Sequence, residues 1–248
     1  MTQEIKIYPV SIVGAGPGDP ELLTLKAKRL LENAQVVIYD RLISPQIIAM
    51  INPGAETVFA GKSCKHHIMT QDQINLSLVE FAKLGKKVVR LKGGDPFIFG
   101  RGGEEIEFLL EHNIPFETVP GISSASGCSA AFNIPLTHRD LSNNVRYVTG
   151  HAKANKLDLD WEKIVDPVGT LVIYMGLANV NLICENLIKH GLPENFPIAV
   201  IENGTLDNQR IVVGELSDIA DKVKIADLQS PSLIIVGKVV SLYYKFKP

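Results

Sequence analysis

The chain has 248 residues, a net charge of −2 and 46% hydrophobic residues, a composition that excludes intrinsic disorder and collagen. At roughly 150 residues per domain, the length allows one large domain or two modest ones. Nucleic-acid-binding domains are usually far more basic, so no nucleic-acid partner is expected. No apolar run reaches the roughly 18 residues that cross a bilayer, so no membrane association is expected either. The N-terminus lacks the basic and apolar regions of a secretory signal, and we expect a cytoplasmic protein.

Cysteine usage agrees with a reducing compartment. Cys64, Cys128 and Cys184 are odd in number and far apart, which argues against a disulfide framework or a zinc site. We predict that they are small packing residues. His66 and His67 are adjacent, but no third ligand has suitable spacing, so no metal site is predicted.

The first half of the sequence alternates short β-branched runs with segments of helical period. Strands are predicted at Val10–Val13, Gln35–Tyr39, Thr57–Phe59, Lys87–Leu91 and Phe116–Val119. Helices are predicted over Pro20–Asn33, where Asp19 is a good N-cap, after the capping box at 70–73, and around 106–110. This alternation is typical of an α/β domain with a largely parallel sheet.

The second half has fewer helical patterns. Strands are predicted at Val145–Thr149, Leu171–Met175, Ile198–Ile201, Ile211–Val213 and Leu233–Val236. One long helix pattern ends at Gly191, and none separates the two strands between 198 and 213, so this sheet is predicted to be mixed. We therefore predict two α/β domains, residues 1–136 and 137–248.

Glycine, aspartate and other unusual residues follow nearly every predicted strand. The segments are Gly14–Asp19, Asp40, Gly61–Lys62, Gly93–Pro96, Pro120–Ser124, Gly150–His151, Met175–Gly176 and Glu202–Gly204. Loops favour glycine and aspartate in general, but that explains only one or two of these segments. Because ligands of open α/β sheets bind beyond the carboxyl ends of strands, the pattern predicts a ligand cleft between the two domains.

Two of these segments imitate phosphate-binding motifs. Gly14–Asp19 resembles G-x-G-x-x-G, but Asp19 occupies the third glycine position and Pro17 removes an amide. Gly61–Ser63 resembles the end of a P-loop, but its upstream glycine, Gly54, is too distant and the residues between them read as a strand. The sequence therefore predicts a ligand that approaches bare backbone closely and needs no phosphate-binding amides.

Six segments together resemble a known family. They are Val10–Asp19, Tyr39–Ser44, Val88–Glu105, Val119–Ile122, Ile134–Arg139 and Tyr174–Gly176. With these segments the chain, from about residue 8 to about residue 240, resembles uroporphyrinogen-III C-methyltransferases, which are S-adenosylmethionine-dependent tetrapyrrole methyltransferases. The Gly-Pro-Gly-Asp element is shared with related tetrapyrrole methyltransferases, whereas Gly93–Glu105 together with Asp40 and Thr137–Arg139 is much more specific.

The resemblance implies the tetrapyrrole methylase fold, a homodimer, and S-adenosylmethionine as cofactor with S-adenosylhomocysteine as its product. It implies two successive methylations of a polycarboxylate tetrapyrrole, uroporphyrinogen III, to precorrin-2 in sirohaem or cobalamin biosynthesis, by a stand-alone enzyme. One alternative is a methyltransferase that acts on a later precorrin or cobalt-precorrin intermediate. Another is a non-catalytic tetrapyrrole or nucleoside sensor, against which the presence of Asp40 and Lys62 argues.

The resemblance also implies roles for individual residues. It places the cofactor against Pro17, Gly93, Gly94, Asp95, Ile98, Ser123, Ser124, Met175 and Gly204. Asp40 matches a proton acceptor and Lys62 a proton donor, with a pyrrole N–H contact and a substrate carboxylate contact as their alternative roles. The anionic substrate requires a local basic pocket, for which His138 and Arg139 are the candidates.

Three positions depart from the family pattern. Ser124 replaces a small apolar residue, Asn133 replaces a glycine, and Ser63-Cys64 follow Lys62 where a basic residue is frequent. The last departure leaves the substrate partner near Lys62 open.

Overall fold

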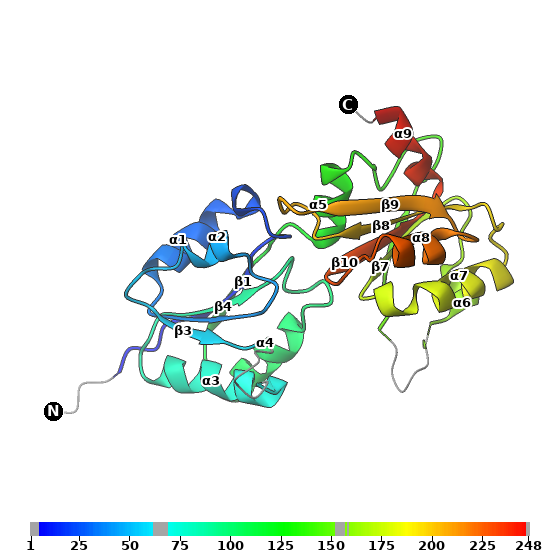
Figure 1. The fold of residues 1–248 in the computed structure, drawn as a ribbon. Helices are drawn as coiled ribbons and strands as arrows, with labels where there is room; N and C mark the ends of the chain where they lie inside the picture. Colours follow the sequence, from blue (N-terminus) through cyan, green and yellow to red (C-terminus); the bar gives the residue numbers. More distant parts are fainter. Residues whose placement is uncertain (1–4, 62–68, 152–156, 158, 247–248) are drawn as a thin grey trace. The chain divides into compact units, whose positions relative to one another are not determined.

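The structure is a computed structural model that describes residues 5–61, 69–151, 157 and 159–246. The chain divides into two compact units, Met1–Ser123 and Ser124–Pro248 (Figure 1). This division lies N-terminal to the predicted boundary at residues 136 and 137, because helix α5 (Ser124–Ala131) packs with the strands of the second unit.

The first unit is built on a five-stranded sheet of order β3-β2-β4-β1-β5. Its strands are β1 Val10–Gly14, β2 Val36–Tyr39, β3 Glu56–Phe59, β4 Val88–Lys92 and β5 Phe116–Val119. All of the pairings are parallel, which confirms the largely parallel N-terminal sheet. As a result, the carboxyl ends of all these strands lie at one edge of the sheet.

Helices cover both faces of this sheet. They are η1 Pro20–Leu22, α1 Leu25–Asn33, α2 Pro45–Ile48, α3 Gln71–Lys83 and α4 Gly102–Glu111. Figure 1 shows α1 and α2 (blue) on one face and α3 and α4 (cyan to green) on the other. Because both faces are covered, the central strands are almost continuously apolar. Arg90 and Lys92 in β4 are buried exceptions.

The single helix predicted over Pro20–Asn33 is wrong at its start. Asp19 caps only the short η1, by accepting a hydrogen bond from the Glu21 amide at 2.8 Å. The backbone is then extended at Thr24, whose hydroxyl accepts from the Ala27 amide at 3.1 Å and begins α1. Threonine is a strong N-cap, and it restarts the helix here.

The second unit also has a five-stranded sheet, in the order β6-β7-β10-β8-β9. Its strands are β6 Val145–Thr149, β7 Thr170–Tyr174, β8 Pro197–Glu202, β9 Arg210–Glu215 and β10 Ser232–Val236. β6 pairs with β7 in parallel and the other pairings are antiparallel, which confirms the predicted mixed sheet. β6, β7 and β8 run in the same direction, so their carboxyl ends share one edge.

Helices cover both faces of this sheet as well. Besides α5, they are α6 Trp161–Ile164, η2 Leu177–Asn179, α7 Val180–Lys189, α8 Ile219–Ile225, η3 Lys238–Ser241 and α9 Leu242–Phe246. α6, α7 and α8 pack on one face, and α5, η3 and α9 on the other (Figure 1). Among these helices, α7 corresponds to the one long helix pattern predicted in this half.

Candidate functional site

Three glycine-containing loops meet at the carboxyl edge of the first sheet. A Cβ atom on Gly14 would lie 2.5 Å from the Gly121 nitrogen and 2.7 Å from the Gly94 carbonyl oxygen. The Gly94 amide donates to the Gly16 carbonyl at 2.8 Å, and the Gly16 amide donates back at 3.2 Å. The loops that follow β1, β4 and β5 are therefore packed backbone to backbone, which only glycine allows.

The Asp95 carboxylate links the loop that follows β4 to the loop that follows β5. Its Oδ1 accepts a hydrogen bond from the Phe97 amide at 2.9 Å, and its Oδ2 accepts one from the Gly121 amide at 3.1 Å. Pro17 and Ile98, which the resemblance assigns to the cofactor, are half-buried in the same loops. The structure thus gives Asp95 a loop-holding role that the sequence analysis missed, while its contact with the cofactor stays a prediction.

Asp40, at the end of β2, is ion-paired with a buried arginine. Its Oδ1 accepts from the Arg90 Nη2 at 2.7 Å; the Asp40 side chain is 30% exposed and that of Arg90 only 2%. Arg90 Nη1 also donates to the carbonyls of Ile38 and Leu91 at 3.4 and 3.3 Å. One oxygen of the carboxylate is therefore held from inside the protein, and the side chain still reaches the surface of the first unit.

Glu105 of α4 lies behind this pair and is completely buried. Its Oε1 accepts hydrogen bonds from Arg90 Nε at 2.9 Å, Lys92 Nζ at 2.9 Å and Gln71 Nε2 at 3.2 Å. Its Oε2 has no hydrogen-bond partner among the described residues. We refer to Asp40, Arg90, Lys92 and Glu105 as the buried charge cluster. The sequence analysis assigned no role to three of its four members.

Burial and the neighbouring carboxylates shift the pKa values of the two cations of this cluster in opposite directions. Burial alone would lower the pKa of Arg90, but the carboxylates of Asp40 and Glu105 outweigh it and raise that pKa above its ordinary value. For Lys92, burial and the nearby Arg90 charge prevail over the two carboxylates, so the pKa of the ammonium group is lowered. Arg90 is thus the permanent cation of the cluster.

The carboxyl edge of the second sheet also carries unusual backbone. Met175 directly follows β7 with a φ of 55°, and Asn203 and Thr205 follow β8 with φ values of 50° and 74°. Such left-handed conformations in non-glycine residues cluster at functional sites. Met175 is 52% exposed, so it does not have the core-packing role that is usual for a strand-end methionine.

Gly204 on the same edge is required by packing within the second unit. A Cβ atom on Gly204 would overlap Cys128 Sγ of α5 and lie 3.2 Å from the Cys128 Cβ. Ser124 begins this helix, and the next amide, that of Ala125, donates to the Tyr174 hydroxyl at 3.1 Å. The sequence analysis assigned Gly204 only to the cofactor and did not predict this contact.

The remaining predicted site residues lie elsewhere. Lys62 and the basic run after it lie outside the described residues. Ser123 is the last residue of the first unit. His138 and Arg139 belong to a turn closed by Ser142, whose hydroxyl accepts from Thr170 at the amino end of β7. The structure therefore does not bring His138 and Arg139 together with Met175, and their role in substrate binding stays a prediction.

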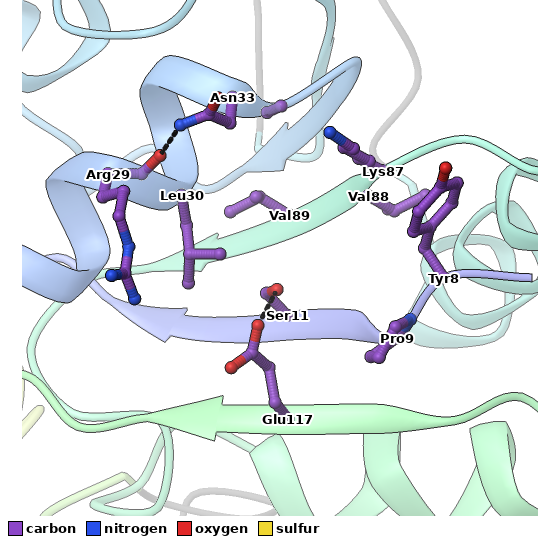
Figure 2. Close-up of a pocket in the computed structure, with 11 residues that line it drawn as sticks. Tyr8, Pro9, Ser11, Arg29, Leu30, Asn33, Lys87, Val88, Val89 and Glu117 are labelled. Atoms are coloured by element: carbon purple, nitrogen blue, oxygen red, sulfur yellow. Dashed lines mark hydrogen bonds between the residues drawn. The ribbon is translucent and has the colours of Figure 1, made fainter.

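A hollow of about 280 Å³ in the first unit lies away from these residues. Figure 2 shows it between α1 and the strands, with Tyr8 and Pro9 at the start of β1 and Ser11 donating to Glu117. It opens at the amino ends of β1 and β4, whereas the predicted site residues of this unit follow the carboxyl ends. It contains none of them.

Within the described part of the chain, no helix combines the length and apolar composition needed to span a bilayer. Within the same residues, no three His, Cys, Asp or Glu side chains are grouped so as to hold a metal ion.

Comparisons with known proteins identify the family. The model of the tetrapyrrole (corrin/porphyrin) methylases matches residues 9–220. The chain is 54% identical to a siroheme synthase of Pseudomonas fluorescens (strain SBW25) over 96% of its own length and 51% of that protein. A siroheme synthase of Thioalkalivibrio sulfidiphilus is 51% identical over 96% of the chain and 49% of that protein. The chain thus spans about half the length of these curated relatives.

Solved structures agree with this match. Uroporphyrin-III C-methyl transferase from Thermus thermophilus, complexed with S-adenyl homocysteine, is 39% identical and matches with a TM-score of 0.81 over 95% of this chain and all of that one. A cobalt precorrin-4 methyltransferase matches with a TM-score of 0.84 at 27% identity, over 94% of this chain and 95% of that one. The resemblance stated from the motifs is confirmed, and the chain belongs to the tetrapyrrole (corrin/porphyrin) methylase family.

Proposed function

We propose that this chain is an S-adenosylmethionine-dependent C-methyltransferase that converts uroporphyrinogen III to precorrin-2 by two successive methylations. The observation that carries the proposal is the 39% identity to the Thermus uroporphyrin-III C-methyl transferase over nearly the whole of both chains. It is supported by Asp40 and the glycine loops at the carboxyl edge of the first sheet. The proposal covers methylation alone, because the siroheme synthases that resemble the chain are about twice as long.

The residues at the two strand edges fit the cofactor. S-adenosylmethionine carries a nucleoside and an amino-acid chain and supplies an electrophilic methyl group when bound. The first unit offers the partly exposed backbone of Gly93 together with the half-buried side chain of Ile98, and the second offers the exposed thioether of Met175. We assign Pro17, Gly94, Asp95, Ser123, Ser124 and Gly204 to the same cofactor on the motif resemblance.

Asp40 supplies negative charge beside the reacting pyrrole. When a pyrrole carbon gains a methyl group, positive charge spreads over the ring and a proton must leave. Arg90 holds Oδ1 at 2.7 Å, and the Asp40 side chain is 30% exposed, so we propose that its second oxygen meets the substrate. That oxygen accepts a pyrrole N–H, stabilises the ring charge or takes the proton, an effect of about 10²–10⁴-fold on rate when proton transfer is involved.

Lys62 is proposed as proton donor or substrate carboxylate contact, and His138 and Arg139 as further basic contacts. In the turn, His138 Nδ1 accepts from the Asp140 amide at 3.2 Å, which leaves the Nε2–H of a neutral ring to donate to a carboxylate. Arg139 is exposed and can bind a carboxylate in bidentate fashion. We further propose that the protein is a homodimer, on the resemblance alone, and that it is cytoplasmic, on its cysteine usage.

The proposal is tested by offering the purified protein three substrates in parallel with the methyl donor under anaerobic conditions. These are uroporphyrinogen III, precorrin-2 and a cobalt-precorrin intermediate. We expect rapid methylation of uroporphyrinogen III and of its monomethylated product only. Methylation of the cobalt-precorrin alone would replace the proposal by the alternative of a later enzyme of the pathway.

The role of Asp40 is tested by Asp40→Asn, which keeps the shape of the side chain and removes its charge. We expect turnover to fall by about 10²-fold or more, while the cofactor dissociation constant measured by calorimetry changes little. Unchanged turnover would remove Asp40 from the mechanism. An equal loss of turnover and cofactor affinity would make it a cofactor-binding residue instead.

A further inference from the structure

Resting on the proposed methyltransferase function, we propose that Glu105 is a positioning residue that acts through Arg90 on Asp40. Glu105 lies on α4, is fully buried, and accepts from the Nε of the same guanidinium whose Nη2 donates to Asp40. It can touch neither substrate nor cofactor from there. Its influence on the reaction therefore has to pass through the groups it contacts.

Arg90 is held in one orientation by groups around its planar guanidinium. Glu105 Oε1 accepts from Nε at 2.9 Å, and backbone carbonyls accept from Nη1. These contacts leave Nη2 directed at Asp40 Oδ1, 2.7 Å away. Because the donors of a guanidinium form a rigid fork, fixing Nε and Nη1 also fixes the Nη2 that holds Asp40.

Glu105 also balances the charge that surrounds Asp40. The buried charge cluster contains two cations, Arg90 and Lys92, and two carboxylates, Asp40 and Glu105, joined by contacts of 2.7 to 2.9 Å. Without the Glu105 charge, both buried cations would depend on the Asp40 carboxylate alone. Arg90 or Lys92 would then pull Asp40 inward, away from the surface at which it meets the substrate.

The hydrogen bonding of Glu105 itself points to a specialised role. Three donors converge on Oε1, while the buried Oε2 has no partner among the described residues. Three donors on one oxygen hold the Glu105 side chain in place, so the position of Arg90 Nε is fixed with it.

The decisive variant is Glu105→Gln, and Glu107→Gln is its matched control. Both lie on α4 and undergo the same chemical change, but Glu107 is exposed. For Glu105→Gln we expect kcat to fall about tenfold to hundredfold, as when a reacting group is displaced by about an ångström. KM for the methyl donor and the calorimetric cofactor affinity should remain at the wild-type values. The control should match the wild type in all three measurements.

A double variant with Asp40→Asn tests whether the effect passes through Asp40. If Glu105 acts only by placing that carboxylate, the double variant should be as slow as Asp40→Asn alone. If the two substitutions instead reduce kcat by independent factors that multiply in the double variant, the proposal is overturned and Glu105 is a structural residue. A loss of cofactor affinity in Glu105→Gln that parallels the loss of kcat would overturn it in the same way.

Two further comparisons keep the test decisive. If Glu105→Gln does not fold, the charge-balanced variant Lys92→Met/Glu105→Gln replaces it, and wild-type kcat in that variant would equally overturn the proposal. If instead the wild type itself does not methylate uroporphyrinogen III, the proposed function fails. The positioning role is then tested on whichever tetrapyrrole the wild type methylates, with the same variants and the same outcomes.

Discussion

Replacing Gly204 by alanine tests whether packing against α5 requires a glycine there. The added Cβ would overlap Cys128 Sγ and lie only 3.2 Å from Cys128 Cβ and Ile201 Cγ2, whereas ordinary contact begins at 3.4 Å. Gly204 does not have a positive φ, so backbone strain does not contribute. Overpacking of this kind costs about 1–3 kcal/mol. Both contacts with α5 are to Cys128, which is buried and well packed. We therefore expect Gly204→Ala to lower the free energy of unfolding by about 2 kcal/mol.

Cys128→Ala removes the overlapping sulfur and should rescue this variant. Cys128→Ala alone should lower the free energy of unfolding by about 1 kcal/mol. The double variant should be no less stable than Cys128→Ala, which corresponds to a coupling energy of about 2 kcal/mol between the two substitutions. Denaturant unfolding followed by the fluorescence of Trp161, the single tryptophan, reports on the unit that contains both residues. Additive losses would refute the packing explanation. Unchanged stability with weaker cofactor binding would show that the ligand, not α5, requires the glycine.

Three other predictions concern local contacts. Thr24→Ala should lower the free energy of unfolding by about 1 kcal/mol, because α1 loses its N-cap; an unchanged denaturation midpoint would contradict this. Asp95→Asn should cost about 1–2 kcal/mol and weaken cofactor binding in calorimetry, because only one oxygen remains for two backbone amides; wild-type affinity would contradict the loop-holding role. Burial raises the pKa of Cys128 and Cys184 to about 12, so in a Cys64→Ser variant a thiol reagent at about pH 8 should label neither until the protein is unfolded; rapid labelling of the native protein would refute their burial.

The strand edges were the most predictable part of the molecule. The hydrophobic runs indicated the strands, and the residues after them indicated the edges at which we propose the site, because side-chain type at a strand end is read directly from the sequence. Met175 illustrates the limit. Its position at the end of a strand was predicted, but its left-handed backbone and exposure depend on the turn that follows.

The buried charge cluster could not be predicted from periodicity, although a signal was present. Arg90 and Lys92 interrupt a strand that is otherwise apolar on both faces, and they lie two residues apart and so point to the same face. Such a strand demands buried acidic partners. Which acid supplies them depends on how α4 packs, and Glu104 and Glu105 cannot be distinguished without that packing.

Weak helices were missed for a different reason. α5 has only eight residues, among them three serines and a glycine, so its local propensity is weak and its helix depends on packing against the second sheet. Asn133, where the resemblance leads us to expect glycine, follows this helix with a φ of 53°. Asparagine tolerates the left-handed conformation better than most residues, which explains the substitution.

The most direct test of the proposed function is the mass of the product formed from uroporphyrinogen III with a methyl donor that carries an isotopically labelled methyl group. The account predicts a tetrapyrrole with two labelled methyl groups bound to carbon and the absorbance spectrum of precorrin-2. No labelled product from uroporphyrinogen III, or label on a carboxylate rather than on carbon, would contradict it.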